Sequence, residues 1–409
     1  KSAPVRLVDA SEMKVDVGRG YQSQPLLVRR RMAPDSYAMA LTLGVSYVSL
    51  RGVSVRGSTL PQATVSVLKL VVGVGSFALP AAFAQAGLYG GAGGVLLVAA
   101  LSAYCVYLYT LAKAKVSPTA TYFEVGRAAF GRGMEVTMLI MALIASLGSC
   151  AAYMDFMAPT AVTVVGSKQS VITLVMVPLF ILLAWIRSFR YLAFTSILGD
   201  AAFFIAMATV FVDGFMNQSI DTHQPKFVTD TYPTFFGAAV FLYGITLFIS
   251  PIQNSMEQPH KFQRAVNFAY GGTALINVAF GILGLMLWGT GVKPIVINSL
   301  SGSGYVDAAR VFLVCDLALA FPIVLAPGRE IVERWLLGPY GTRVRHDALK
   351  RNVIRAVLVL AVAGISLSVP FFLDLVGLLS GMALISTSLV FPPLCYMSLH
   401  RDEIGLGSK

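Results

Sequence analysis

Residues 68–80 read LKLVVGVGSFALP, and residues 241–251 read FLYGITLFISP. In each stretch a proline follows a glycine by seven residues, and Gly244 follows Gly73 by the same 171 positions that separate the two prolines. Glycine relaxes the backbone and proline removes a hydrogen-bond donor, so both residues weaken a helix. The sequence therefore predicts two apolar helices that are interrupted near their middles, at corresponding places in two halves of the chain.

The composition places these stretches in a membrane protein. Of the 409 residues, 56% are hydrophobic and 12% are charged, whereas soluble domains carry about 25% charged residues. The mean hydropathy is +0.74. A set of soluble domains, a disordered chain and a disulfide scaffold are excluded as first interpretations. Backbone polar groups in lipid must be satisfied within the chain, so long apolar runs predict helices rather than a barrel. We expect an all-α, multi-pass membrane protein.

Ten apolar runs follow one another from residue 61 onward, and each predicts a transmembrane helix. Residues 1–60 are expected to form a cytosolic, partly disordered tail, residues 61–397 the transmembrane domain, and residues 398–409 a short C-terminal tail. Within the domain, one repeat covers about 61–213 and a second about 233–397. Segments 117–133 and 329–337 predict short helices at the membrane surface. The ten runs cover 61–86, 88–112, 134–165, 170–187, 190–213, 233–255, 264–290, 304–328, 352–369 and 371–397.

The basic residues predict the orientation of these helices. Of 31 Lys and Arg residues, 25 lie in segments that share one side of the membrane if the ten runs alternate in direction. Cytosolic segments of membrane proteins carry this excess of basic residues. The N-terminus is therefore expected in the cytosol. The same distribution explains the net charge of +11 and argues against nucleic acid as a partner, because the charge is not gathered on one binding face.

The paired interruptions indicate where a small molecule would bind. Many transporters consist of two inverted repeats and hold their substrate between discontinuous helices near the bilayer midplane. An opened helix exposes free N–H groups at one end and free C=O groups at the other, which suit the carboxylate and the ammonium of an amino acid. Each polar side chain here could instead join helices by hydrogen bonds. The candidate binding residues are Gly73, Val74, Gly75, Ser76, Ser149, Tyr153, Tyr243, Gly244 and Thr246.

Residues 72–83, VGVGSFALPAAF, followed by Ala86-Gly87, resemble the first-helix signature of the amino acid/auxin permease family. Residues 391–396, FPPLCY, resemble its tenth helix, and Lys69 is similar to the proton-coupled and vacuolar branches. The resemblance implies a LeuT-like fold of five plus five helices, with discontinuous first and sixth helices. It also implies secondary transport of amino acids in a plasma membrane or a membrane of the vacuole or lysosome type. Family members usually have eleven helices, one more than the runs counted here.

Ionisable residues inside spans are costly and are functional candidates. Helices one, five and eight meet in the LeuT-like arrangement, and they carry Lys69, Asp200 and Asp316. Our hypothesis is that Lys69 pairs with Asp316 or Asp200, replaces a sodium ion and carries proton coupling. The alternative is a static ion pair that fixes helix packing. Asp155 is expected toward an outer vestibule and Asp374 at the membrane interface.

These observations favour a secondary active amino acid transporter, proton-coupled, that works by alternating access at the two interruptions. The alternative is an amino acid sensor on the same fold, which would signal through a regulatory partner of the tail 1–60. The expected partners are the amino acid and the lipid bilayer. Sodium is the other candidate coupling ion. An enzyme is not expected, because the four histidines are dispersed and no catalytic motif, metal cluster or cofactor site is present in the sequence.

Overall fold

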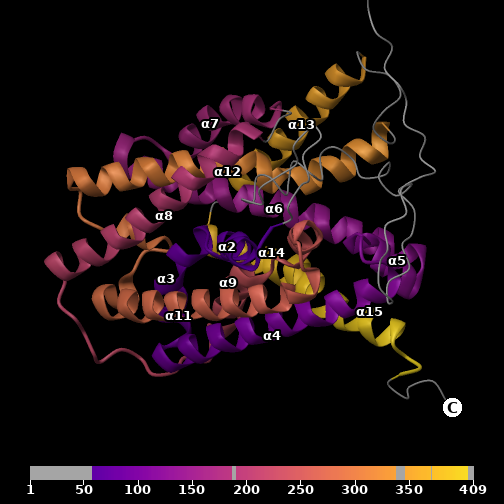
Figure 1. Cartoon of the computed structure of the whole chain (residues 1–409). Coiled ribbons are helices and arrows are strands. Elements are labelled where there is room, and N and C mark those ends of the chain that lie inside the picture. The colour runs from indigo at the N-terminus through magenta and orange to yellow at the C-terminus, as the bar shows by residue number, and fades with distance from the viewer. Residues whose placement is uncertain (1–57, 187–189, 338–345, 370, 404–409) are drawn as a thin grey trace, which may run out of the picture. The chain divides into compact units, whose positions relative to one another are not determined.

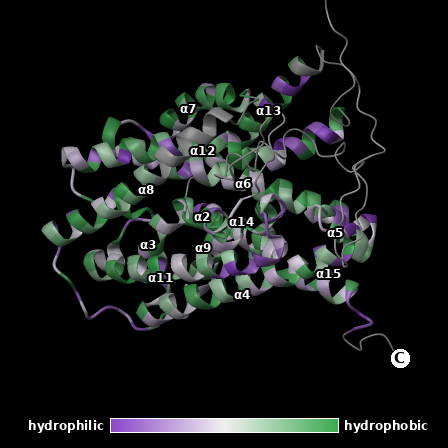
Figure 2. Ribbon diagram, viewed as in Figure 1, coloured by the Kyte–Doolittle hydropathy of each residue, from purple (hydrophilic) through white to green (hydrophobic). Residues whose placement is uncertain are grey.

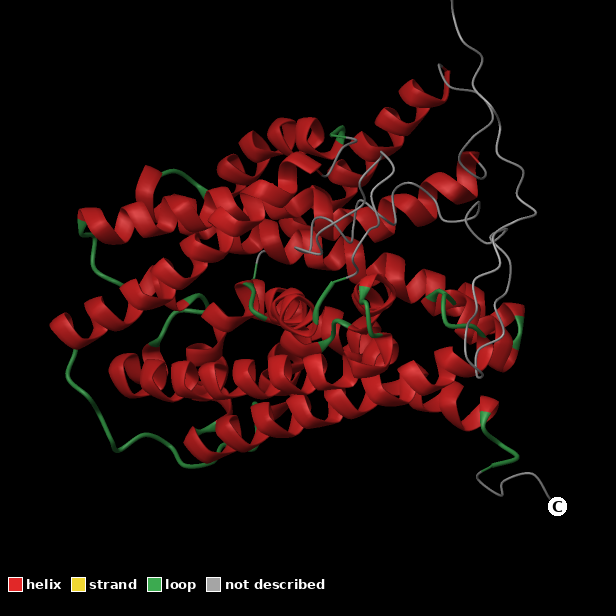
Figure 3. Cartoon of the chain, in the orientation of Figure 1, coloured by secondary structure: helices red, strands yellow, loops and turns green. Residues whose placement is uncertain are grey.

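The computed structural model of the chain describes residues 58–186, 190–337, 346–369 and 371–403, with the backbone alone for 190–200 and 346–348. The predicted tail 1–60 therefore lies almost wholly outside the described residues, as does the end of the C-terminal tail. Within the described part, the regular structure is helical (Figure 3), apart from one isolated bridge between Ser58 and Met256.

The helices follow the predicted apolar runs closely. Those that fall within the predicted first repeat are α2 (Leu60–Val71), η2 (Val74–Ala78), α3 (Leu79–Ala86), α4 (Leu88–Val116), α5 (Tyr122–Phe130), α6 (Arg132–Val165), α7 (Gln169–Ala184) and α8 (Arg190–Asn217). Those in the second are α9 (Tyr232–Tyr243), η3 (Thr246–Phe248), α10 (Ile249–Ser255), η4 (Pro259–Lys261), α11 (Phe262–Trp288), η5 (Gly289–Gly291), η6 (Val296–Ser299), α12 (Gly304–Leu337), α13 (His346–Ser368), α14 (Phe372–Leu379), η7 (Ser380–Leu384), η8 (Ser386–Val390) and α15 (Phe391–Leu399).

Seven of the described helical segments are long and apolar enough to cross a membrane, and eight are if the bent pair α2 and η2–α3 counts as one span. Shorter apolar helices, Gln169–Ala184 and Ala201–Asn217, occupy the fourth and fifth predicted runs. Hydrophobic residues cover most of these helices, whereas hydrophilic residues gather toward their ends and in the connections (Figure 2). This distribution is that of a multi-pass membrane protein.

Local sequence explains where several helices begin. Thr121 and Glu124 form a reciprocal cap at the start of α5, because the Glu124 N–H donates to the Thr121 hydroxyl and the Thr121 N–H donates to the Glu124 carboxylate. The prediction of a short helix within 117–133 is thereby located at α5. Between α3 and α4, Gly87 has a φ of 77°, and a Cβ there would lie 2.7 Å from backbone atoms of Phe227. Glycine is therefore required at this turn.

The first interruption lies between α2 and α3. Helix α2 ends at Val71, Val72 and Gly73 are extended, and a 3-10 turn from Val74 to Ala78 leads into α3. The two halves meet at 45°. Pro80 stands in the first turn of α3, where its missing N–H costs no intrahelical bond. The proline thus begins the second half, and the chain opens seven residues earlier, at the glycine.

The second interruption lies between α9 and α10. Helix α9 ends at Tyr243, Gly244 and Ile245 leave the helix, and the turn η3 leads into α10. The Ile245 N–H and the Tyr270 hydroxyl both donate to the last carbonyl of α9, that of Tyr243, at 2.9 and 3.2 Å. These two bonds cap a carbonyl that has no partner inside its own helix.

One prediction about surface helices was wrong. Segment 329–337 is not a separate helix, because α12 continues from Gly304 to Leu337 through Pro322 and Pro327. Ser146 of α6 explains how it continues past Pro327. Its hydroxyl donates to the Val324 carbonyl at 2.7 Å and accepts from the Gly328 N–H at 3.1 Å. The hydroxyl thus bridges a carbonyl and an N–H that lie one turn apart beside Pro327.

Helix α11 is the element against which both halves of the first interrupted helix pack. It contacts α2, α3 and α4, and it runs beside α4 (Figure 1). Glycines allow the close approach to α3: a Cβ at Gly281 would lie 2.5 Å from the Phe83 ring, and one at Gly284 would lie 2.4 Å from Pro80. Small residues at such crossings are typical of membrane helix packing. The buried core extends from this contact through α6, α9, α12 and α14.

Candidate functional site

A cavity of about 280 Å³ lies between the two interruptions. Its wall includes the last turn of α2, the extended residues 72 and 73, and Gly244 with its neighbours. The wall also includes residues of η2, α6, α8, α12 and η7. Ligand pockets in proteins usually measure about 300–1,000 Å³, so a cavity of this size suits a small molecule.

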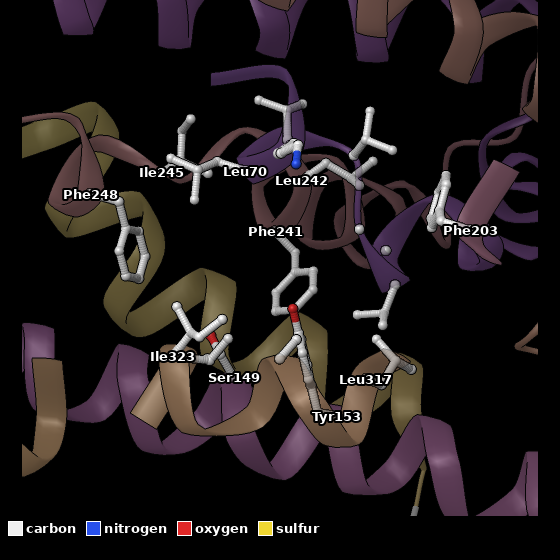
Figure 4. Close-up of a pocket in the computed structure, with 18 of the residues that line it drawn as sticks. Leu70, Ser149, Tyr153, Phe203, Phe241, Leu242, Ile245, Phe248, Leu317 and Ile323 are labelled. Atoms are coloured by element: carbon white, nitrogen blue, oxygen red, sulfur yellow. The ribbon is translucent and has the colours of Figure 1, made fainter. Parts of the chain in front are cut away.

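Six of the nine predicted binding residues line this cavity. In Figure 4, Ser149 and Tyr153 of α6 lie on one side, and the Tyr153 hydroxyl is directed toward the ring of Phe241 on α9. Phe248, which follows the second interruption, also contributes to the wall. The six residues are Gly73, Val74, Gly75, Ser149, Tyr153 and Gly244.

Two of the three predicted coupling residues line the same cavity. Lys69 belongs to the last turn of α2, where a cation interacts favourably with the negative end of the helix dipole. Asp316 also lines the cavity and belongs to α12, which is far from α2 in the sequence. Asp200 lies in α8, but its side chain is outside the described residues. The cavity therefore combines an ammonium, a carboxylate and two neutral hydroxyls with a wall that is otherwise apolar.

The backbone at the first interruption has N–H and C=O groups beside the cavity. The Val72 N–H donates to the Leu68 carbonyl at 2.8 Å, and the next bond along the described backbone runs from the Ser76 N–H to the Gly73 carbonyl at 2.9 Å. Helix ends leave N–H and C=O groups without intrahelical partners. Here those groups are the C=O groups of residues 70–72 and the N–H groups of residues 73–75, and each of these residues lines the cavity.

The other three predicted binding residues do not line the cavity. Ser76 and Tyr243 are buried and join a network on α11 instead. The Ser76 hydroxyl donates to Asn277 Oδ1 at 3.0 Å, and Asn277 Nδ2 donates to the Tyr243 hydroxyl at 3.3 Å. Thr246 is fully buried in the turn η3. Ser76 and Tyr243 thus have the helix-joining role that hydroxyls often have in membranes. The Thr246 hydroxyl is buried without a hydrogen-bond partner among the described residues.

Asn277 is the residue of this site that the sequence analysis missed. It is 1% exposed and lies in the middle of α11. A signal was present, since an amide in the apolar run ALINVAF is itself unusual in a transmembrane helix. Only the folded chain reveals that its two partners flank different interruptions.

Other buried charges lie away from the cavity. Asp155 does not face a vestibule: it is 1% exposed, and the Ser366 hydroxyl of α13 donates to it. Glu333 of α12 is fully buried between Arg351 and Arg355 of α13, at 3.0 and 2.7 Å. Two arginines around one carboxylate fix the ends of these helices against each other.

The fold and the cavity define a class of protein. A helical bundle with several candidate membrane spans holds a small cavity lined by residues that follow α2 and α9. Transporters with discontinuous helices place their substrate site in a similar position.

Residues 56–406 match the family described as Transmembrane amino acid transporter protein, and the chain belongs to that family. The resemblance to amino acid permeases is thereby confirmed, and members of this family are transporters rather than enzymes.

Several named relatives are similar over most of the chain. Amino acid transporter AVT3C of Arabidopsis thaliana is 28% identical, with 83% of each chain covered. Vacuolar amino acid transporter 3 of Schizosaccharomyces pombe is 24% identical over 82% of this chain, which spans about half of that relative, 52% of its length. The proton-coupled amino acid transporter-like protein pathetic of Drosophila melanogaster is 23% identical, with 82% of this chain covered.

A solved structure supports the fold. The inward-facing conformation of Mhp1, a LeuT-fold protein, aligns with a TM-score of 0.53 at 16% identity, and the alignment covers 83% of this chain and 80% of that one. At this identity the likeness shows the fold alone.

Proposed function

We propose that the chain is a secondary active transporter that carries neutral amino acids, with the substrate held in the cavity between Gly73–Gly75 and Gly244. The observation that carries this proposal is that residues of both interruptions line one small cavity. The carboxylate of the substrate would accept from N–H groups of residues 73–75, and its ammonium would lie near the carbonyls that end α2. The mostly apolar wall favours an uncharged side chain, since an unpaired charge there would be costly to bury.

The proposed mechanism is alternating access in a five-plus-five inverted repeat with ten spans. The interruptions at Gly73 and Gly244 are hinge points, since each leaves a stretch of backbone without helical bonds. With the N-terminus in the cytosol, as the distribution of basic residues favours, α2 and α10 form the cytosolic halves of the two interrupted helices. The backbone bonds from the Ser58 N–H to the Ser255 carbonyl and from the Glu257 N–H to the Ser58 carbonyl join these halves at 2.8 and 3.1 Å.

Protons are the proposed coupling ion, and sodium is the alternative. Lys69 and Asp316 supply a basic and an acidic group to the wall of the same cavity. Opposite charges at close range stabilise each other's charged forms, so a movement of α2 that changed their separation would change proton affinity. A static ion pair would not respond in this way. The names of the relatives, vacuolar and proton-coupled amino acid transporters, favour a proton-driven carrier in a vacuole-type membrane.

Uptake of radiolabelled L-alanine and L-leucine into proteoliposomes tests this function. The protein should accumulate at least one of them when a pH gradient is imposed, and a sodium gradient alone should not drive accumulation. No flux of either amino acid, nor of the other neutral ones, would refute the transport proposal. Accumulation driven by sodium alone would overturn the proton assignment but keep the carrier. The sensor alternative depends on the tail 1–60 and stays a prediction.

A further inference from the structure

We infer that Asn277 is a positioning residue. It fixes the positions of the two interruptions relative to each other and so sets the geometry of the cavity, without contacting the substrate. This inference rests on the proposed function for its meaning, because the cavity matters only if it is the substrate site. The structural claim itself stands on the hydrogen bonds of α11.

The chemistry of the amide explains why asparagine occupies this position. A primary amide carries one acceptor oxygen and a nitrogen with two donor hydrogens. Asn277 uses the oxygen for the hydroxyl of Ser76, in the turn that follows the first interruption, and the nitrogen for the hydroxyl of Tyr243, the last residue before the second. Leucine at this position would offer neither group, and aspartate would lack the donor.

The face of α11 that carries Asn277 is directed at both interrupted helices. Tyr270, seven residues earlier on the same face, donates to the Tyr243 carbonyl, and its ring lies 5.5 Å from the Tyr243 ring. Gly281 and Gly284 lie on the same face of α11, toward its C-terminus, and pack against α3. Asn277 is therefore a polar contact in a tightly packed seam, with α9 on one side and η2–α3 on the other.

Burial makes these bonds costly to lose. Asn277 is 1% exposed, and Ser76 and Tyr243 are fully buried. A buried polar group that loses its partner bears the full free-energy cost of its desolvation, and this cost is larger than the net gain from forming the bond. Truncating Asn277 would remove the acceptor of the Ser76 hydroxyl and the donor to the Tyr243 hydroxyl, which would keep only Thr273 as a side-chain partner. The positions of Gly73–Gly75 and of Gly244 would then no longer be fixed relative to each other.

The test compares Ser76→Ala, Tyr243→Phe, Asn277→Ala and the double variant Ser76→Ala/Asn277→Ala with the wild type. Thr160→Val is the matched control, because Thr160 is also fully buried but its hydroxyl donates only to its own helix, to the Phe156 carbonyl at 2.7 Å. Apparent KM and maximal rate are measured for L-alanine and L-leucine in proteoliposomes. Deuterium exchange is measured in detergent for peptides that cover residues 72–86 and 241–252.

We expect Asn277→Ala to raise the apparent KM by about tenfold and to increase exchange in both peptides. The double variant should be no worse than Asn277→Ala alone, because residues that act through one network are not additive. Thr160→Val should change neither measurement.

Two results would overturn the inference. One is a double variant in which the effects of Ser76→Ala and Asn277→Ala on KM multiply, and the other is increased exchange at one interruption only. If the wild type transports neither of these nor any other neutral amino acid, the proposed function fails, and the exchange measurement still decides the role of Asn277. If Asn277→Ala does not fold, Ser76→Ala and Tyr243→Phe supply the same comparison, with increased exchange in both peptides expected from each.

Discussion

Alanine at Gly75 should damage the protein, whereas alanine at Gly73 should be tolerated, although the two glycines stand two positions apart in one motif. A Cβ at Gly75 would lie 2.8 Å from Cδ2 of Leu242 and 3.0 Å from Cδ1 of Phe241. Carbon atoms pack best at about 3.5–4.0 Å, so both side chains would have to move. A Cβ at Gly73 meets no atom within 4 Å. The φ of −154° at Gly73 is extended and open to any residue.

The size of the effect follows from this crowding. Inserting a methyl group into a packed interior costs about 1–3 kcal/mol, and a substitution that meets no neighbour usually changes stability by less than about 0.5 kcal/mol. Denaturant unfolding of the two variants in the same detergent measures this difference. Gly75→Ala should also reduce amino acid uptake more than Gly73→Ala does, because Phe241 and Leu242 line the cavity.

Equal stabilities of the two variants would refute the reasoning, since the close approach of α9 to Gly75 would then have no energetic consequence. A larger loss at Gly73 would mean that this glycine is needed for a backbone conformation that differs from the extended one described here.

Substitutions at four named side chains have further expected outcomes. Asp316→Asn should remove most of the pH dependence of uptake, and unchanged pH dependence would exclude Asp316 from coupling. Glu333→Gln would remove the buried carboxylate that pairs with Arg351 and Arg355 and should lower the free energy of unfolding by about 3–5 kcal/mol. Glu330→Gln, which removes a partly exposed pair, should cost less than about 1 kcal/mol in the same assay. Tyr153→Phe should raise the apparent KM with little change in stability, and an unchanged KM would remove its hydroxyl from the binding site.

The interrupted helices could be predicted because glycine and proline act locally. The equal spacing of Gly73 with Pro80 and of Gly244 with Pro251 predicted two interruptions, and α2 and α9 end next to these glycines, at Val71 and Tyr243. The reason why glycine is needed at position 75 differs from the expected one. Gly75 is needed less for backbone freedom than for room, because Leu242 of another helix reaches it. That contact joins residues far apart in the chain, and no local pattern contains it.

The direction of side chains beside an interruption could not be predicted. In a regular helix the period of 3.6 residues assigns each side chain to a face, but the extended residues and 3-10 turns here have no such period. Ser76 and Tyr243 accordingly face Asn277 rather than the cavity. The continuity of α12 past Pro327 could not be predicted either. The side chain that bonds to the backbone there, Ser146, comes from a helix that lies far away in sequence.

The most direct test of the central claim is protection of the cavity by its substrate. Ser149 lines the cavity and is partly buried, so Ser149→Cys is introduced into a variant in which the four native cysteines are replaced by alanine. The rate of labelling by a membrane-permeant maleimide is then measured with and without an amino acid that the protein transports. Our account predicts that the substrate slows labelling in proportion to its occupancy, and that an amino acid that is not transported has no effect. Labelling that the transported amino acid leaves unchanged, in a variant that still carries it, would place the substrate elsewhere.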